Sequence, residues 1–166
     1  MAFEQTTKND GLQDRLISAK RHAKVTKGGR LFSFATCVVV GDGKGYIGFS
    51  KRSAREISIA MPKALEKARR SMLYVEMNNG TIYHRVEASY GATKVVILPT
   101  QDTGIIAGGA MRAIFEVVGI KNVVAKIIGS RNSINVIRAT LKALQKVNSP
   151  EAIAEKRGKT LKELYE

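Results

Sequence analysis

The sequence has a single cysteine, no tryptophan and no long apolar segment. One cysteine excludes a disulfide framework and a zinc site built on cysteine pairs. No run approaches the ~18 apolar residues of a membrane-spanning helix, and the N-terminus, MAFEQTTKNDG, lacks the apolar segment of a signal peptide. We therefore expect a cytoplasmic protein with no membrane partner.

Acidic residues are also scarce relative to basic ones. The 166 residues include 28 Lys and Arg against 14 Asp and Glu, which gives a formal net charge of +14. Such an excess favours a nucleic acid partner. The two histidines, His22 and His84, lie far apart and lack metal-ligand spacing, so we expect no metal, no cofactor and no catalytic centre.

A basic glycine loop is the most informative local feature. Lys24, Lys27 and Arg30 surround Gly28-Gly29. Glycine has no side chain to hold a ligand away, so a polyanion can approach the backbone here. The loop predicts a phosphate contact.

The glycines that follow predict a hairpin turn. Gly41-Asp42-Gly43-Lys44-Gly45 joins the strand Phe32–Val40 to the strand Tyr46–Phe49. A dinucleotide loop would instead lead into a helix, so the hairpin is favoured. Cys37 lies within the apolar run of the first strand and is expected to be a buried, reduced thiol.

The rest of the first half predicts a further strand and a helix. The second half of residues 12–25 is expected to form a strand with a basic face. A helix follows Arg55, with the apolar stripe Met61, Ala64, Leu65, Ala68 and Met72. Ser58 is its expected N-cap, which would leave Pro62 near the first turn.

The second half predicts a hairpin and two strand–helix units. Asn79-Gly80 indicates a hairpin between residues 73–77 and 82–86, and a domain boundary falls at about 72–78. The later elements are a strand at 93–99, a glycine loop at 103–109, a helix at 110–118, a strand at 123–128 and a helix at 132–147 with Ile134, Ile137, Leu141 and Leu144 on one face. Pro150 closes this segment before a charged helical tail.

Two weaker features allow more than one interpretation. Gly108-Gly109 before a helix could hold a phosphate, but tight packing of the loop is favoured. Tyr74, Tyr83 and Tyr90 are scattered, which favours packing over a base-stacking platform.

Several segments together resemble a known family. The segments GGRLFSF, VVVGDGKGYIGF, KALEKARR, NNGTIYH, TGIIAGGAMRAI, NVVAKIIGS, INVIRATLKAL and SPEAIAEKRGK are similar to those of the fifth protein of the bacterial small ribosomal subunit. The combination is specific, whereas GDGKG alone would be weak. Two departures are Thr36, where the family more often has a small apolar residue, and Lys51-Arg52-Ser53, which replaces a glycine and lysine arrangement.

The resemblance implies an α+β fold. A double-stranded-RNA-binding-like β-β-β-α domain (12–75) would follow a mobile tail (1–11). It would precede a C-terminal β-α-β-α domain with a split, left-handed crossover (76–150) and a charged helical tail (151–166).

The resemblance also implies a function and partners. The chain would bind small-subunit ribosomal RNA and contact the fourth and eighth proteins of that subunit. It would stabilise the head against the body, line the path by which messenger RNA enters and influence accuracy. The segment Lys27–Arg30 corresponds to the family region associated with spectinomycin sensitivity.

The expected site residues follow from the basic segments and from the resemblance. The predicted interface with the fourth protein contains Gly104 and Arg112. The predicted RNA-binding residues are Lys20, Arg21, Lys24, Lys27, Gly28, Gly29, Arg30, Lys51, Arg52, Arg55, Arg69 and Arg70.

Two other classes of protein remain as alternatives. A phosphotransferase would need a lysine or serine in its glycine loop and paired carboxylates for magnesium, but residues 101–109 contain neither lysine nor serine, and Asp102 is their one carboxylate. A free-standing double-stranded-RNA-binding module would not need the second half. We therefore expect a non-enzymatic assembly protein.

Overall fold

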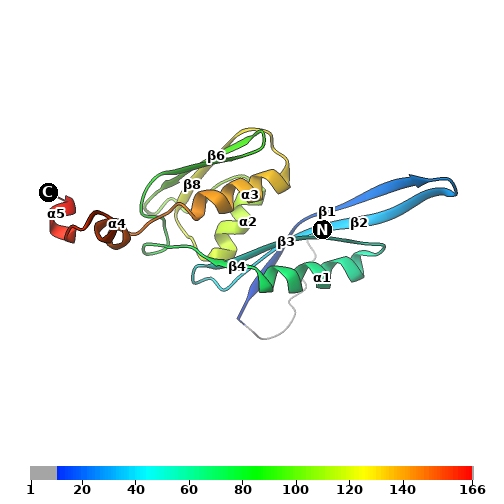
Figure 1. The fold of residues 1–166 in the computed structure, drawn as a ribbon, viewed down its shortest axis with the longest axis horizontal. Helices are drawn as coiled ribbons and strands as arrows, with labels where there is room; N and C mark the ends of the chain where they lie inside the picture. Colours follow the sequence, from blue (N-terminus) through cyan, green and yellow to red (C-terminus); the bar gives the residue numbers. More distant parts are fainter. Residues whose placement is uncertain (1–10, 166) are drawn as a thin grey trace. The chain divides into compact units, whose positions relative to one another are not determined.

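The computed structural model describes residues 11–165, so the predicted tail lies outside the described residues except for Gly11. The chain divides into two compact units. The first contains the residues up to Tyr74 together with Ala113–Gly119, and the second contains Val75–Arg112 and the residues from Ile120 onward. Both combine strands and helices, which confirms the α+β class (Figure 1).

The first unit is built on an antiparallel sheet in chain order. Its strands are β1 (Gln13–Thr26), β2 (Gly29–Gly41), β3 (Tyr46–Ala54) and β4 (Met72–Tyr74). The predicted hairpin between β2 and β3 is confirmed. The Asp42 carboxylate accepts the backbone N–H groups of Lys44 (2.7 Å) and Tyr46 (3.0 Å), which fixes the turn. β1 is longer than predicted, and β4 overlaps the strand predicted at residues 73–77 but is shorter and pairs with β3.

Helix α1 (Ile57–Arg70) packs on one face of this sheet. Ala60, Ala64 and Ala68 are fully buried and are spaced by four residues, so they form a narrow stripe of small side chains. Ala64 and Ala68 join Val38 and Val40 of β2 in one core cluster. The predicted stripe was partly wrong: Met61 and Leu65 are half-buried, and Met72 belongs to β4.

The predicted start of α1 was also wrong. The helix begins at Ile57, and Glu56 occupies the N-cap position with no side-chain capping bond. Ser58 lies within the first turn, where its hydroxyl donates to the Glu56 carboxylate (3.2 Å). Pro62 therefore falls in the second turn and cannot pair with the carbonyl group of Ser58. Both residues are exposed, so water can solvate that carbonyl group.

The other face of the sheet is covered by the segment Ala113–Gly119, which includes the second half of α2 (Gly109–Val118). The backbone N–H groups of Gly43 and Gly45 donate to the carbonyl oxygens of Val117 and Val118, both at 3.0 Å. The β2 residues facing this side include Cys37, which is buried as predicted. The unit is therefore discontinuous in sequence.

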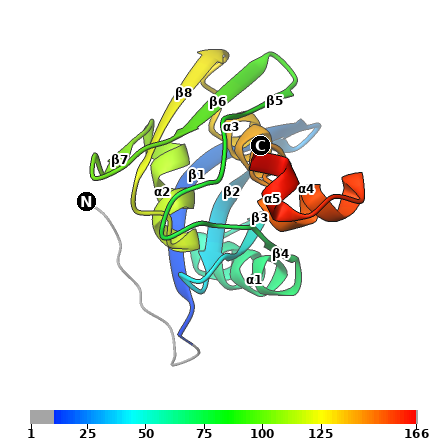
Figure 2. The same ribbon diagram turned by 90° about the vertical axis from the view of Figure 1, so that its left-hand side faces the viewer.

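The second unit has a mixed sheet in the order β5 (Val86–Tyr90), β6 (Thr93–Pro99), β8 (Val123–Gly129), β7 (Ile105–Ile106) (Figure 2). β5, β6 and β8 are antiparallel, and β7 runs parallel to β8. Helix α3 (Ser133–Leu144) packs on β5 and β6. The strands β6 and β8 and the helices α2 and α3 lie close to their predicted positions, whereas the two-residue β7 was not predicted. On α3, Ile137 and Leu144 are buried as expected, but Ile134 and Leu141 are half-buried.

The Asn-Gly signal predicted a turn correctly and a hairpin wrongly. Asn79 (φ 46°) and Gly80 (φ 82°) are both left-handed, as a tight turn requires, and a single bridge joins Asn78 to Thr81. The flanking segments do not pair further, because β4 pairs with β3 and β5 pairs with β6.

The chain ends in α4 (Pro150–Arg157) and α5 (Leu161–Tyr165). Pro150 begins α4 rather than simply closing α3, since the Ser149 hydroxyl caps the helix by accepting the N–H of Ala152 (3.3 Å).

Candidate RNA-binding surface

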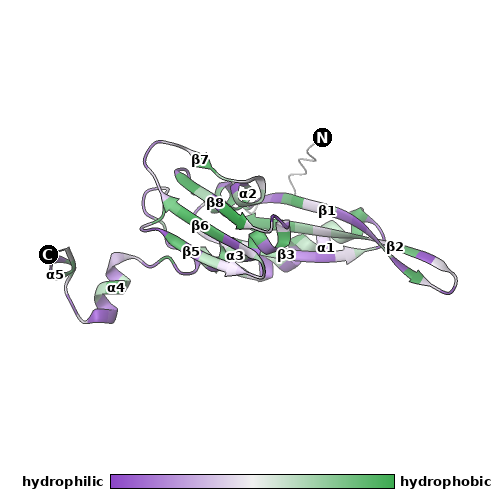
Figure 3. Ribbon diagram, turned by 90° about the horizontal axis from the view of Figure 1, so that it is seen from above, coloured by the Kyte–Doolittle hydropathy of each residue, from purple (hydrophilic) through white to green (hydrophobic). Residues whose placement is uncertain are grey.

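The hairpin of β1 and β2 continues beyond the rest of its sheet. The last pair between β2 and β3 joins Phe34 to Ala54, whereas β1 and β2 remain paired out to Thr26 and Gly29. Every residue from 19 to 32 is exposed. Hydrophilic and hydrophobic residues follow each other along this ribbon, which projects past the N-terminal end of α1 (Figures 1 and 3). It offers two solvent-exposed faces to a partner.

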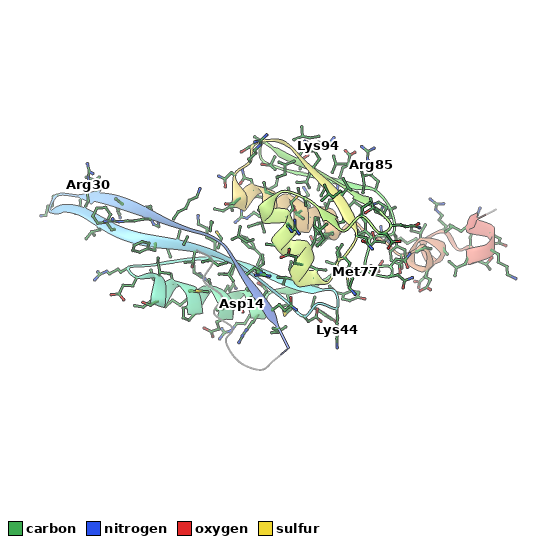
Figure 4. The ribbon with its side chains drawn as sticks, turned by 180° about the vertical axis from the view of Figure 1, so that it is seen from behind. Asp14, Arg30, Lys44, Met77, Arg85 and Lys94 are labelled. Atoms are coloured by element: carbon green, nitrogen blue, oxygen red, sulfur yellow. The ribbon has the colours of Figure 1, made fainter. Side chains whose placement is uncertain are left out.

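The end of the ribbon is a tight basic turn. Lys27 and Gly28 connect the last pair, and the Thr26 hydroxyl donates to the Gly29 carbonyl oxygen (3.1 Å). Gly29 has a φ of 127°, which requires glycine. A Cβ built on Gly28 or Gly29 would have no atom within 4 Å, so a ligand has room beside the backbone. Arg30 lies at this end of the hairpin (Figure 4).

The cross-strand register divides the predicted basic residues between the two faces of the sheet. Directly opposed residues of antiparallel strands share a face, and successive residues alternate. The α1 side, defined by Val38 and Val40, includes Arg21, Arg30 and Arg52. The opposite side includes Lys20, Lys24 and Lys51. The predicted RNA-binding residues therefore do not form one continuous face.

On the α1 side, the Arg21 guanidinium lies over the Phe32 ring, 3.8 Å from the ring centre. Phe32 is 45% exposed, so the pair forms a flat cationic and aromatic surface on the ribbon. The departure at Thr36 is explained on the same side: this residue is fully buried, and its hydroxyl donates to the Arg52 carbonyl oxygen (3.3 Å).

The structure does not bring Arg69 and Arg70 together with the turn. α1 starts beside Arg55, near the ribbon, and ends beside Gly48 of β3, about 20 Å away along the helix axis. Arg70 pairs with Glu66 one turn earlier, and both side chains are exposed. Arg69 acts instead on Asp14 of β1: burial raises the pKa of the Asp14 carboxyl, and the positive charges of Arg69 and Arg15 partly oppose this rise. Arg69 and Arg70 therefore belong to a separate region.

Both predicted protein-interface residues, Gly104 and Arg112, belong to the second unit. Gly104 has a φ of 70°; its N–H donates to the Asn122 side chain (3.1 Å), and its carbonyl accepts from Val123 (3.0 Å). Arg112 is exposed on α2, four residues after Gly108. Between them, Ile106 of β7 is 54% exposed. The region combines an exposed apolar side chain with a cation.

For Gly108, the favoured packing interpretation fits its surroundings, because an added Cβ would lie 3.1 Å from the Ile127 side chain. A Cβ on Gly109 would meet nothing within 4 Å, so packing does not account for that glycine.

Two surface features were missed by the sequence interpretation. Tyr74 and Tyr46 form an exposed cross-strand ring pair with centroids 5.1 Å apart, whereas Tyr74 was expected to be a packing residue. Arg138, Lys142 and Lys146 form a row beside β5, which their spacing of four residues could have indicated. Among residues 11–165 there is no group of three metal-ligating side chains, and no helix there is long and apolar enough to cross a membrane.

Comparisons with known proteins agree over both units. The family model "Ribosomal protein S5, N-terminal domain" matches residues 12–76, and "Ribosomal protein S5, C-terminal domain" matches residues 88–157. The small ribosomal subunit protein uS5 of Legionella pneumophila (strain Paris) is 50% identical over 165 residues, covering 99% of this chain and 98% of the relative. The protein of the same description from Alcanivorax borkumensis is 51% identical over 165 residues, with 99% of each chain covered. That of Nitrosococcus oceani is 54% identical over 156 residues, covering 93% of this chain and 92% of the relative.

Proposed function

Because this chain belongs to the ribosomal protein S5 family, we propose that its exposed β1–β2 ribbon binds ribosomal RNA within the small subunit. Membership makes the chain a structural, non-enzymatic constituent of the small subunit of the cytoplasmic bacterial ribosome, with ribosomal RNA as its partner. Which residues meet the RNA is our proposal.

One observation carries the proposal: the ribbon is cationic, exposed on both faces, and ends in a turn with open space beside Gly28 and Gly29. An isolated two-stranded ribbon gains little from burial in its own domain, so its length favours a role in binding a partner. The lysines of one face and Arg30 of the other can contact phosphates on both sides of a groove.

The test is the salt dependence of binding to small-subunit ribosomal RNA transcribed in vitro. Replacing Lys24, Lys27 and Arg30 together with alanine should lower the slope of log K against log salt by roughly two to three. The matched control replaces Lys156, Lys159 and Lys162 with alanine. These substitutions remove the same charge from the exposed tail and should leave the slope near that of the wild type. An unchanged slope in the folded ribbon variant would exclude the ribbon from the RNA site.

The family resemblance supports finer proposals for the second unit. Gly104 and Arg112 would meet the fourth protein of the subunit, and the eighth protein would be a further neighbour. The exposed Ile106 between them supports a protein contact, because apolar side chains form the centres of protein interfaces. With RNA bound by the first unit and proteins by the second, the chain would stabilise the head against the body, line the path by which messenger RNA enters and influence accuracy.

A further inference from the structure

The second unit carries its own excess of positive charge. Between Tyr83 and Ser149 the sequence has nine Lys and Arg but only three Asp and Glu. None of these basic residues lies on the ribbon. Surface lysines are often simply solvated, so an excess of positive charge indicates a binding surface only where the fold brings the charged side chains together.

Three of these cations are arranged in a row. Arg138 and Lys142 lie one turn apart on the exposed side of α3, and Lys146 follows in the turn that continues beyond the helix. The row, here called the α3 ridge, extends about 12 Å along the helix axis, since four residues rise about 6 Å. No acidic residue occurs within α3.

Each member of the α3 ridge is held against β5, the outer strand of the sheet. Lys146 Nζ donates to the carbonyl oxygen of Glu87 (3.1 Å), and Lys142 Nζ lies 3.5 Å from that of Ser89. The Arg138 guanidinium donates to the Tyr90 hydroxyl, and its centre lies 5.1 Å from that ring. These contacts restrict long side chains that would otherwise lose conformational entropy on binding.

The ridge keeps most of its capacity to bind an anion. An ammonium group has three donors and a guanidinium five, and each contact above uses one. The one carboxylate on β5 is that of Glu87, and it is engaged by Lys94 (2.7 Å) and by Arg85. Arg85 and Lys94 lie on the second unit in Figure 4. Within residues 11–165, no ridge side chain forms an ion pair.

We propose that the α3 ridge is a second contact for the phosphodiester backbone of ribosomal RNA, separate from the ribbon. This inference rests on the proposed function of binding small-subunit RNA. A regular row of preordered cations fits a polyanionic strand, and the adjacent, partly exposed Tyr90 ring can pack against a base or sugar. A protein partner fits less well, because the exposed Leu98 and Ile128 alternate with the buried residues of β6 and β8 and so face away from α3. The lysines also cover carbonyl groups of the β5 edge, which hinders addition of a strand.

The experiment uses the full chain and small-subunit ribosomal RNA transcribed in vitro. The double variant Lys142→Gln/Lys146→Gln should lower the salt slope by roughly 1.5 to 2 and weaken binding roughly tenfold near 0.1 M salt. The control Lys121→Gln/Lys126→Gln removes the same charge from exposed positions of the same unit and should behave like the wild type. The variant Lys142→Arg/Lys146→Arg keeps the charge and should retain the slope.

Each outcome decides the inference. A wild-type slope for the Gln variant, or an equal loss in the control, would overturn it, as would crosslinking of the ridge to an acidic protein rather than to RNA in assembled subunits. Unfolding curves identify a Gln variant that fails to fold. In that case the Arg variant tests the ridge instead, through the RNA segment to which its ridge crosslinks. Measuring the ribbon variant in parallel separates the two proposals. If only the ribbon variant loses slope, the proposed function of the ribbon stands and the proposed role of the α3 ridge is refuted. If only the ridge variant loses slope, the proposed role of the ribbon is refuted.

Discussion

The close approach of α1 to β3 at Gly48 allows a sharp test of the packing. A Cβ added at Gly48 would lie 2.0 Å from the carbonyl oxygen of Ala68 and 2.8 Å from its carbonyl carbon. Both contacts are with helix backbone, which cannot rotate away as a side chain can. Gly48 has no left-handed φ, so the cost of Gly48→Ala is steric alone.

The expected loss of stability follows from that distance. The helix would have to move by about 1 Å before the contact became tolerable, and overpacking of this kind costs about 1–3 kcal/mol. The Ala68 carbonyl also accepts the N–H of Ser71 (3.1 Å) at the end of α1, and straining this bond adds about 1 kcal/mol. We expect Gly48→Ala to lower the free energy of unfolding by about 2–4 kcal/mol.

Urea denaturation gives the total change, and residue-resolved hydrogen exchange locates it. Protection should fall in α1 and β3 but not in β6 and β8, which belong to the other unit. Gly28→Ala is the control, because its Cβ meets no atom within 4 Å and its φ is not left-handed; it should change stability by less than about 0.5 kcal/mol. Wild-type stability and unchanged protection of α1 in Gly48→Ala would refute the packing argument.

Two further predictions concern the second unit. Arg112→Leu should weaken the proposed contact with the fourth protein by about 1–3 kcal/mol. If that contact must break when the subunit closes on transfer RNA, the substitution should also raise misreading. A near-cognate stop-codon reporter measures this, and unchanged accuracy with normal subunit assembly would contradict the prediction. Hydrogen bonds from Lys94 and then Arg85 lower the pKa of Glu87. The stability that the ionised Glu87 carboxylate contributes is therefore present above the unfolded-state pKa and is lost as the pH falls through the lower folded-state pKa. An NMR titration should show this depressed pKa, and it should return toward 4.5 in Lys94→Ala/Arg85→Ala; an ordinary value in the wild type would contradict the assignment.

Local chemistry made part of the fold predictable from sequence. The turn between β2 and β3 follows from glycines with positive φ and from an aspartate that accepts two nearby N–H groups, all within five residues. The strands β6 and β8 and the helix α2 follow from continuous apolar patterns. These signals do not depend on distant parts of the chain.

Distant pairing explains the errors. Residues 73–77 were predicted to form a hairpin with residues 82–86, but β4 pairs with β3, whose residues come more than twenty positions earlier. The start of α1 was misplaced because Ser58 is a favoured N-cap residue, while packing of Ala60, Ala64 and Ala68 on the sheet sets the helix position instead.

The candidate site was predicted by residue type but not by arrangement. The basic residues near Gly28 were identified from charge alone, whereas their division between two faces depends on the strand register and on an irregularity between Leu16 and Ser18. The α3 ridge was missed because its significance comes from β5, whose edge carbonyl groups the lysines contact only in the folded chain.

The discontinuous first unit has a consequence for folding during synthesis. β1 to β4 and α1 are complete once Tyr74 has emerged, but the segment that covers the other face of the sheet ends at Gly119. At 5–20 residues per second, this delay lasts roughly 2 to 9 s. During that interval the side chains around Val39 have no cover from Ala113–Gly119, so the nascent first unit should remain incompletely protected and open to chaperones. A chain stopped at the end of the N-terminal family match, residue 76, would keep that surface exposed, and the family boundary is therefore not a boundary at which folding is finished.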